Sequence, residues 1–225
     1  MRLPAAVLWD MDGTLVDSEK LWDVALYEAA DWLGGSLSAS RRATLVGSNL
    51  TATSRYLLTL ANREPSEDAV TEVSEWIRGR TRNLFADELP WRPGARDALE
   101  SVSQAGIPCA LVTSTERSLT ELALDTIGRR FFDATVCGDE VDGLNKPHPE
   151  PYRRAARLLG ADPAHCVAVE DSPVGAESAA SAGCTVLVVP CDVRVEPGRR
   201  RTFRTSLVGV DAATISALAL DGRGC

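Results

Sequence analysis

The chain lacks several features that would assign it to a common class. It contains no apolar run of the roughly 18 residues that a membrane-spanning helix needs. It has no Walker A motif, which argues against a nucleoside-triphosphate loop. Its 6 cysteines form no CxxC pair and no zinc-finger spacing, so a structural metal finger is not expected. The 24 Lys and Arg are outnumbered by 32 Asp and Glu, and the net charge of −8 argues against nucleic acid or an anionic membrane as a partner.

What the chain does contain is typical of a globular protein with a substantial core. Of its 225 residues, 44% are hydrophobic and 25% charged, which excludes a disordered or collagen-like chain. At roughly 150 residues per domain, this length corresponds to one large or two small domains. The N-terminus shows no signal-peptide cleavage pattern, and several cysteines lie in apolar, strand-like segments. We therefore expect reduced, buried thiols and a cytoplasmic location.

Short apolar runs alternate with helical patterns along most of the chain. The runs are rich in valine and show no polar alternation, as expected of strands buried on both faces of a sheet. They cover residues 4–9, 107–112, 134–137, 166–169 and 185–189. Helical patterns cover residues 93–104, 117–127, 150–159 and 173–182, with glycine soon after each end. The sequence predicts an α/β fold with a doubly wound, Rossmann-like parallel sheet and helices on both faces.

One long segment after the first strand breaks this alternation. Residues 18–89 contain only helical patterns, at 19–33, 39–46, 51–62 and 66–85. We interpret them as an inserted all-helical domain of residues 16–89, with residues 1–15 and 90–225 forming the α/β core. Pro90 and Pro93 suit a stiff hinge between the two. The basic segment 198–204 is expected to be a solvated loop, and Trp32 and Trp76 are expected to pack in the core of the helical domain.

Two carboxylates, Asp10 and Asp12, directly follow the first predicted strand. Side chains two residues apart on an extended chain point the same way, so both should reach the C-terminal edge of the sheet. That edge is where open α/β folds bind ligands. Gly13 permits a sharp turn there, and Thr14 follows it. A cation between the carboxylates and an acid/base pair both fit this pattern.

Other predicted strands end in similar chemistry. Glu170 and Asp171 follow the 166–169 strand, and such oxygen ligands suit Mg²⁺. Thr113 and Ser114 close the 107–112 strand and can offer hydroxyl and N–H groups to an anion. Lys146, held between Asn145 and Pro147, suits a fixed point charge before a helix. Together these residues describe phosphoryl transfer to a carboxylate nucleophile, with Mg²⁺ as cofactor.

The motifs resemble the haloacid dehalogenase superfamily, in its helical-cap (subfamily I) branch. DMDGTLVDSE is similar to the family's nucleophile motif, LVTST to its hydroxyl motif, KPHPEPY to its lysine motif and VEDSPVGAESAASAG to its acidic motif, in the family's order. The resemblance implies that Asp10 attacks phosphorus, and that Asp12 protonates the leaving oxygen and then activates water. It implies that Asp10, the Asp12 carbonyl and Asp171 bind Mg²⁺. The residues expected to bind substrate or phosphate are Gly13, Thr14, Thr113, Ser114, Lys146 and Glu170.

Some residues narrow the resemblance to particular members of the superfamily. Asp12 argues against a dehalogenase, and the EDS sequence at 170–172 favours sugar-phosphate members over phosphoglycolate phosphatases. DSEKLWDVA resembles the start of the cap in hexose- and 2-deoxyglucose-6-phosphate phosphatases. β-Phosphoglucomutase relatives carry His where Trp22 stands and Arg near Leu50, so the sequence favours hydrolysis over a mutase reaction.

The predicted function is therefore a Mg²⁺-dependent phosphatase of small phosphorylated metabolites, most of all sugar phosphates. A β-phosphoglucomutase-like phosphotransferase and a regulatory or binding protein on the same fold are the alternatives. In the cap, Trp22, Gly47, Ser48 and Asn49 are the candidates for substrate contact, although an ordinary interhelical turn explains residues 47–49 equally well. We expect the protein to be a monomer or weak dimer.

Overall fold

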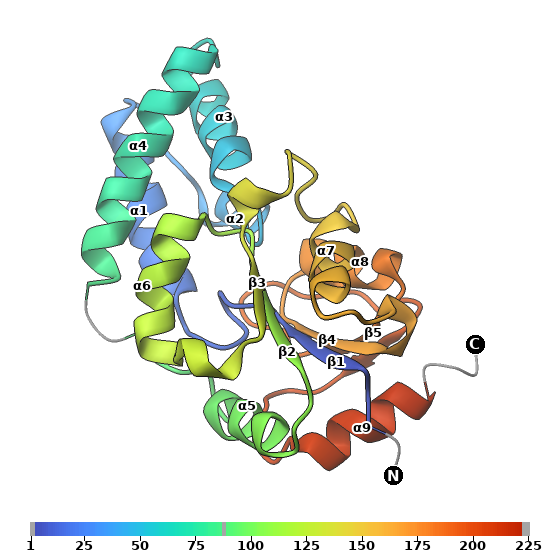
Figure 1. Cartoon of the computed structure of the whole chain (residues 1–225). Helices are drawn as coiled ribbons and strands as arrows, with labels where there is room; N and C mark the ends of the chain where they lie inside the picture. Colours follow the sequence, from blue (N-terminus) through green and yellow to red (C-terminus); the bar gives the residue numbers. More distant parts are fainter. Residues whose placement is uncertain (1–2, 87–88, 222–225) are drawn as a thin grey trace.

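The structure, a computed structural model, describes residues 3–86 and 89–221. Within them, parallel strands form one six-stranded sheet in the order β3-β2-β1-β4-β5-β6 (Figure 1). The strands are β1 (Ala6–Trp9), β2 (Cys109–Val112), β3 (Ala134–Val136), β4 (Cys166–Glu170), β5 (Thr185–Val188) and β6 (Arg201–Phe203). The predicted Rossmann-like parallel sheet is confirmed.

Helices cover both faces of this sheet. Successive strand residues point to opposite faces, so Val7 and Trp9 enter one hydrophobic cluster while Ala6 and Leu8 enter another. The first cluster lies under α5 (Ala95–Gln104), α6 (Arg117–Ile127) and α9 (Ala212–Asp221), and the second under α7 (Glu150–Leu158) and α8 (Pro173–Ala182). Short 3-10 turns at Arg129–Phe131, Gly138–Glu140 and Pro163–His165 complete the connections. Because both faces are covered, the central strands are apolar throughout.

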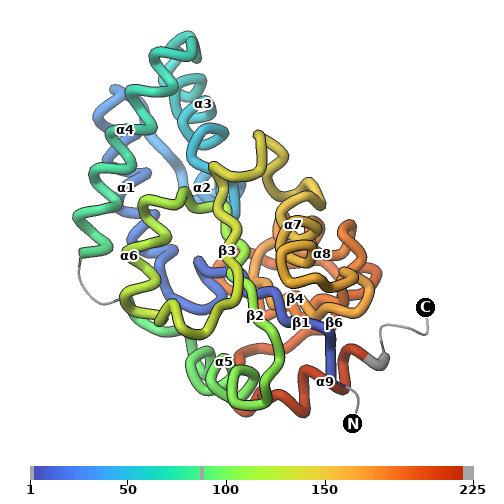
Figure 2. The backbone as a smooth tube through the Cα atoms, in the orientation of Figure 1, coloured from blue at the N-terminus to red at the C-terminus, as the bar shows by residue number. Residues whose placement is uncertain are grey.

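The segment between β1 and α5 is helical, as predicted, and gathers at one end of the sheet (Figure 2). It comprises α1 (Glu19–Trp32), α2 (Ala39–Ala43), α3 (Leu50–Leu60) and α4 (Glu67–Leu84). Helices α1, α3 and α4 share a hydrophobic cluster of their own, which includes Leu26, Leu58 and Ile77. We call this segment the cap. The predicted domain boundaries at residues 15/16 and 89/90 stay a prediction.

Two expectations about the fold were wrong, and one helix was missed. The basic segment contains β6, which pairs with β5 as an edge strand; its side chains are mostly exposed, so no apolar pattern marks it. Helix α9 was not predicted. Trp32 was expected in the cap core, but its side chain is 42% exposed and stacks on Trp76 with ring centroids 5.5 Å apart.

The cysteines that the structure describes are free thiols, and most of them are buried, as predicted. Cys109, Cys137, Cys166 and Cys184 are buried free thiols, and Cys191 is partly buried. Cys225 lies outside the described residues. None of the helices within residues 3–86 and 89–221 combines the length and apolarity that a bilayer crossing requires.

Replacement of Leu58 by Ala should destabilise the protein by about 2–5 kcal/mol, because it opens a cavity in the fully buried cap cluster. Urea unfolding followed by circular dichroism would measure this loss. Leu158→Ala is the matched control: that side chain is 57% exposed, so its removal should change the free energy of unfolding by less than about 0.5 kcal/mol. Equal losses in the two variants would contradict the cap cluster as a source of stability.

Candidate active site

The candidate site lies where the strand order reverses. Strands β2 and β3 extend the sheet on one side of β1, while β4, β5 and β6 extend it on the other. Open α/β folds bind ligands at such a switch point, beyond the carboxyl ends of the strands. Trp9 pairs with Val169 in the ladder, and the Asp10 N–H donates to the Val169 carbonyl at 3.0 Å. The acidic residues that end β1 and β4 are thus brought side by side.

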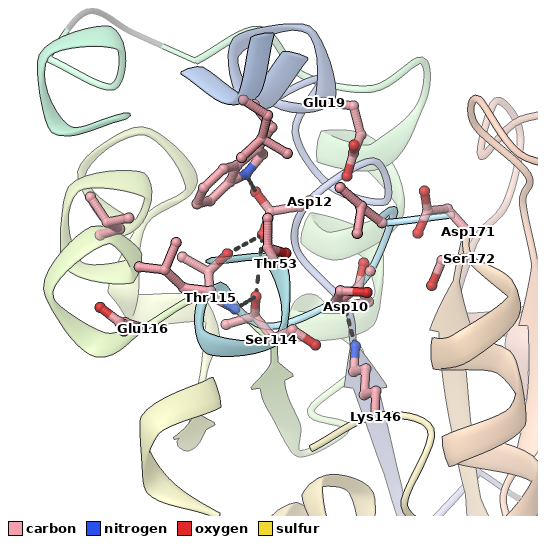
Figure 3. A pocket seen from close by; sticks show the side chains of 18 of the residues that line it. Asp10, Asp12, Glu19, Thr53, Ser114, Thr115, Glu116, Lys146, Asp171 and Ser172 are labelled. Carbon is pink, nitrogen blue, oxygen red and sulfur yellow. Dashed lines mark hydrogen bonds and ion pairs between the residues drawn. The ribbon is translucent and has the colours of Figure 1, made fainter. Parts of the chain in front are cut away.

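Lys146 joins these strand ends from the loop before α7. Its Nζ lies 2.7 Å from Asp10 Oδ1 (Figure 3). It also lies 2.7 Å from Glu170 Oε1 and 3.0 Å from the Val112 carbonyl. The Tyr152 hydroxyl also donates to Glu170 Oε1, at 2.5 Å. The Lys146 side chain is only 2% exposed, so its charge depends on these carboxylates rather than on water.

The buried carboxylates outnumber the ammonium group that balances them. Burial raises the pKa of Asp10 to about 7; the charge of Glu170 adds to the rise and Lys146 opposes it. Burial also raises the pKa of Asp171 well above its usual range, with Asp10 and Glu170 contributing. Burial alone would lower the pKa of Lys146, but Asp10 and Glu170 outweigh it and raise that pKa. The lysine therefore stays charged, and the carboxylates need a further positive charge.

A cation fits this need. Carboxylate oxygens of Asp10, Glu170 and Asp171 lie within 4.8 Å of one another. Asp10 Oδ2 and Asp171 Oδ2 are buried and have no hydrogen-bond partner among the described residues. Glu170, in contrast, is occupied by Lys146 and Tyr152 at one oxygen and by the Ser172 hydroxyl, at 3.2 Å, at the other. Two unpartnered carboxylate oxygens in a dry site suit a hard divalent cation.

Gly13 and Thr14 support Asp171. Gly13 has a φ of +79°, and a Cβ there would lie 2.2 Å from Asp171 Oδ2, so only glycine permits this approach. Thr14 Oγ1 donates to Asp171 Oδ1 at 3.5 Å. Their N–H groups donate to the carbonyls of Val16 and Met11 within the loop. Both residues therefore lie beside the acidic cluster, in contact with Asp171. Their contact with phosphate stays a prediction.

Asp12 points away from the acidic cluster, toward the cap and β2. Its carboxylate accepts four hydrogen bonds: from Ser18 Oγ at 2.6 Å, Trp22 Nε1 at 3.0 Å, Thr113 Oγ1 at 3.2 Å and Thr115 Oγ1 at 2.8 Å. Trp22 thus lines the pocket and contacts Asp12 through its indole N–H. The spacing of Asp10 and Asp12 does place both carboxylates at one site, but gives them different neighbours.

The other predicted residues divide between the pocket and its surroundings. Ser114, Gly47 and Ser48 line the pocket, and the buried Ser114 Oγ has no partner among the described residues. Gly47 has a φ of +76°, and a Cβ there would lie 2.5 Å from Val174 Cγ2, so this cap loop packs tightly against the start of α8. Asn49 does not line the pocket. Its side chain accepts the Ala52 N–H at 2.8 Å and caps α3, as an ordinary turn residue would.

Several residues at the pocket were missed. Glu19 and Arg42 form an ion pair of 2.6 Å between α1 and α2, and Arg42 Nε also lies 2.7 Å from Asp23 Oδ1. Burial raises the pKa of Glu19 to about 7, against the charge of Arg42. Arg78 of α4 binds Glu116, the residue directly before α6, through both Nε and Nη2, at 2.6 and 3.2 Å. No local spacing marks these pairs, because their partners come from different helices.

Comparison with known proteins agrees with this geometry. A sequence model of haloacid dehalogenase-like hydrolases matches residues 4–183. The chain is 33% identical to hexitol phosphatase B of Escherichia coli strain K12 over 187 residues, 82% of this chain and 83% of that protein. It is 32% identical to a phosphorylated carbohydrates phosphatase of Thermotoga maritima over 179 residues, 79% and 81% of the two chains.

The solved structures show the same architecture. The crystal structure of CbbY from Rhodobacter sphaeroides in complex with phosphate superimposes with a TM-score of 0.83 and 27% identity, covering 94% of this chain and 99% of that chain. The family match spans most of the chain, including the strand ends that carry Asp10, Thr113 and Asp171 and the loop that carries Lys146. This chain therefore belongs to the haloacid dehalogenase-like hydrolases and is an enzyme of that family.

Proposed function

We propose that this enzyme is a Mg²⁺-dependent phosphatase that hydrolyses small phosphorylated carbohydrates through an aspartyl-phosphate on Asp10. The proposal depends on how Asp10 is held: Lys146 binds one carboxylate oxygen, and the other is buried close to Asp171 with no partner in the described part of the chain. A carboxylate held in this way is a suitable nucleophile toward an anionic phosphoryl group. Two relatives are named as a hexitol phosphatase and a phosphatase of phosphorylated carbohydrates, and these names support the proposed substrate class.

The acidic cluster would hold the cation. Asp10 and Asp171 have the free oxygens, and the backbone carbonyl of Asp12 is the third protein ligand that we propose. Glu170 supports the cluster through Lys146 and the Asp171 N–H, to which its Oε2 lies at 3.2 Å. A bound Mg²⁺ would offset the carboxylate charge and stabilise negative charge on the transferring phosphoryl oxygens.

Two displacements at phosphorus would follow. In the first, an Asp10 oxygen bonds to phosphorus, the ester P–O bond breaks, and Asp12 gives a proton to the leaving alcohol oxygen. In the second, Asp12 takes a proton from water, the water oxygen bonds to phosphorus, and the bond from phosphorus to Asp10 breaks. The Ser114 hydroxyl, which has no partner among the described residues, would donate to a phosphoryl oxygen. Lys146 and Thr113 would do so by exchanging their present acceptors, Asp10 and Asp12, for phosphoryl oxygens.

The cap and the core both line the pocket in which this chemistry would occur. Trp22 and Ser18 donate to Asp12 from the cap side, while Thr113 and Thr115 donate from the core side. Gly47 of the cap also lines the pocket and packs against Val174 at the start of α8. Closure of the cap over a substrate would exclude water and strengthen the electrostatic stabilisation of transferring charge.

Phosphate release from a panel of hexose, hexitol, pentose, glycolate and nucleoside phosphates tests the function. Release from sugar phosphates should require Mg²⁺ and stop with EDTA. Asp10→Asn should lower kcat by more than about 1,000-fold, because the amide cannot act as the nucleophile. Isomerised sugar phosphate without free phosphate would contradict hydrolysis and favour the mutase alternative. Unchanged turnover in Asp10→Asn would contradict the covalent mechanism.

The cation should stabilise the protein more at high pH than at low pH. Burial raises the pKa of Asp10 from 3.8 to about 7, so between these values the folded protein retains a proton that the unfolded chain has released. The stability of the cation-free protein should therefore fall as pH rises through this window. Mg²⁺ should raise the Tm, measured by circular dichroism, more at about pH 8 than at about pH 5.5.

The Asp10→Asn variant should lose much of this pH dependence, because the substitution removes the carboxyl group whose pKa is raised. The exposed Asp31, on α1 of the cap, provides the matched control, and Asp31→Asn should keep the wild-type profile. A Mg²⁺-induced rise in Tm that is equal at both pH values would argue against a cation at this cluster.

Replacement of Trp22 by Phe should reduce kcat by up to about tenfold with little change in KM, because it removes one donor to Asp12 and keeps the aromatic packing. Steady-state phosphate release measures both constants. Trp76→Phe is the control, because Trp76 stacks on Trp32 away from the pocket. If KM changed and kcat did not, Trp22 would be a substrate contact rather than a positioning residue for Asp12.

A further inference from the structure

Residues of the core and residues of the cap both line the pocket, and we call these two parts of its lining the catalytic end and the cap end. Asp10, Lys146 and Asp171 form the catalytic end. The cap end contains Glu19 of α1 and Arg42 beside it, together with the lining residues Leu45, Leu50 and Thr53. In Figure 3 the Glu19 carboxyl group projects toward the side of the pocket where Asp12 and Asp171 lie. The part of a substrate that lies beyond its phosphoryl group would occupy this end.

Only two positively charged side chains line the pocket in the part of the chain that the structure describes, Arg42 and Lys146. Lys146 cannot serve the cap end. An ammonium group has three donors, and those of Lys146 face Asp10, Glu170 and the Val112 carbonyl. Its charge therefore belongs to the catalytic end.

The charge of Arg42 is already balanced within the cap. Its guanidinium lies 2.6 Å from Glu19 Oε2 and 2.7 Å from Asp23 Oδ1, and its side chain is only 6% exposed. Two carboxylates thus share one guanidinium group. Even if Glu19 were protonated, the charge of Asp23 would balance that of Arg42, and the three side chains together would be neutral. Glu116, the other acidic residue toward the cap, is paired with Arg78. Among the described residues, the cap end has no uncompensated positive charge.

A second anionic group on the substrate would therefore find no partner here. A carboxylate or a second phosphate would lose its hydration and face Glu19, and a buried charge without a partner is strongly unfavourable. A hydroxyl group meets no such penalty, since it both donates and accepts. Glu19 Oε1 can accept from it, and the guanidinium of Arg42 has further N–H groups to donate.

We propose that the substrate carries a single phosphate on an otherwise uncharged, polyhydroxylated carbon skeleton, and that Glu19 and Arg42 bind its hydroxyl groups. This inference rests on the proposed phosphatase function and narrows it to neutral sugar or alditol monophosphates. Leu45 and Leu50 supply an apolar wall for the C–H groups of such a skeleton. Transfer of a phosphoryl group to a second hydroxyl of a sugar phosphate passes through a bisphosphate, which the same charge balance disfavours.

The first test compares matched substrates that differ only in charge at the distal end. Glucitol 6-phosphate is paired with 6-phosphogluconate, and fructose 6-phosphate with fructose 1,6-bisphosphate. With Mg²⁺, kcat/KM for phosphate release should be roughly 100-fold higher for the neutral member of each pair. A charged member hydrolysed as well as its neutral partner would overturn the proposal.

The second test assigns the discrimination to Glu19. Glu19→Gln keeps the shape and an acceptor but removes the carboxylate opposite Arg42, so the preference for the neutral member should fall by about tenfold or more. Glu28→Gln is the matched control: it removes a carboxylate from the same helix, at an exposed pair with Arg80. A preference that is unchanged in Glu19→Gln would overturn the role of Glu19, and the wild-type comparison decides the substrate class even if this variant does not fold.

Acetyl phosphate separates the two proposals, because it reaches the catalytic end and has no distal group. If the enzyme hydrolyses it in a Mg²⁺- and Asp10-dependent manner and shows no charge preference in the pairs, the phosphatase function stands and the substrate inference fails. If neither acetyl phosphate nor any sugar phosphate releases phosphate, the proposed function fails and the inference fails with it.

Discussion

A single buried ammonium group, that of Lys146, holds together the carboxylates at the ends of β1 and β4. The arrangement needs the parallel sheet, which brings Asp10 and Glu170 to one edge, and the loop before α7, which carries the lysine to them. One positive charge does not balance three buried carboxylates. Burial and the charges of the neighbouring carboxylates therefore raise the pKa of both Asp10 and Asp171. The fold thus maintains an unfavourable charge cluster that a cation would relieve.

The cap completes the site rather than only covering it. Two of the four donors to Asp12, Ser18 and Trp22, lie on the cap side of the pocket. The ion pair of Arg78 with Glu116 joins α4 of the cap to α6 of the core, directly after the strand-end threonines. Contacts between the cap and the core thus both position Asp12 and join the two parts beside the pocket. In the acid/base role that we propose for Asp12, its action would depend on the position of the cap.

Polar groups that folding alone would not favour concentrate at this site. Asp10 Oδ2, Asp171 Oδ2 and Ser114 Oγ are buried without partners among the described residues. Away from the site, the central strands and the two clusters that flank the sheet are apolar, and Trp9 Nε1 in β1 is the one side-chain atom there that is also buried without a partner among the described residues. Departures of this kind are expected where a protein binds a ligand, because the ligand supplies the missing partners.

The sequence by itself determined the sheet, most of its helices and the strand-end residues of the site. Each depends on a local signal: apolar runs for buried strands, glycines after helices, and polar residues directly after a strand. It could not predict β6, whose exposed side chains carry no apolar pattern. Only the tertiary structure decided which charged side chains in the pocket are already paired with one another. Glu19 and Arg42, for example, lie 23 positions apart and pair across two helices. Charge balance inside a pocket is a property of the packed chain, since it depends on which side chains meet after folding.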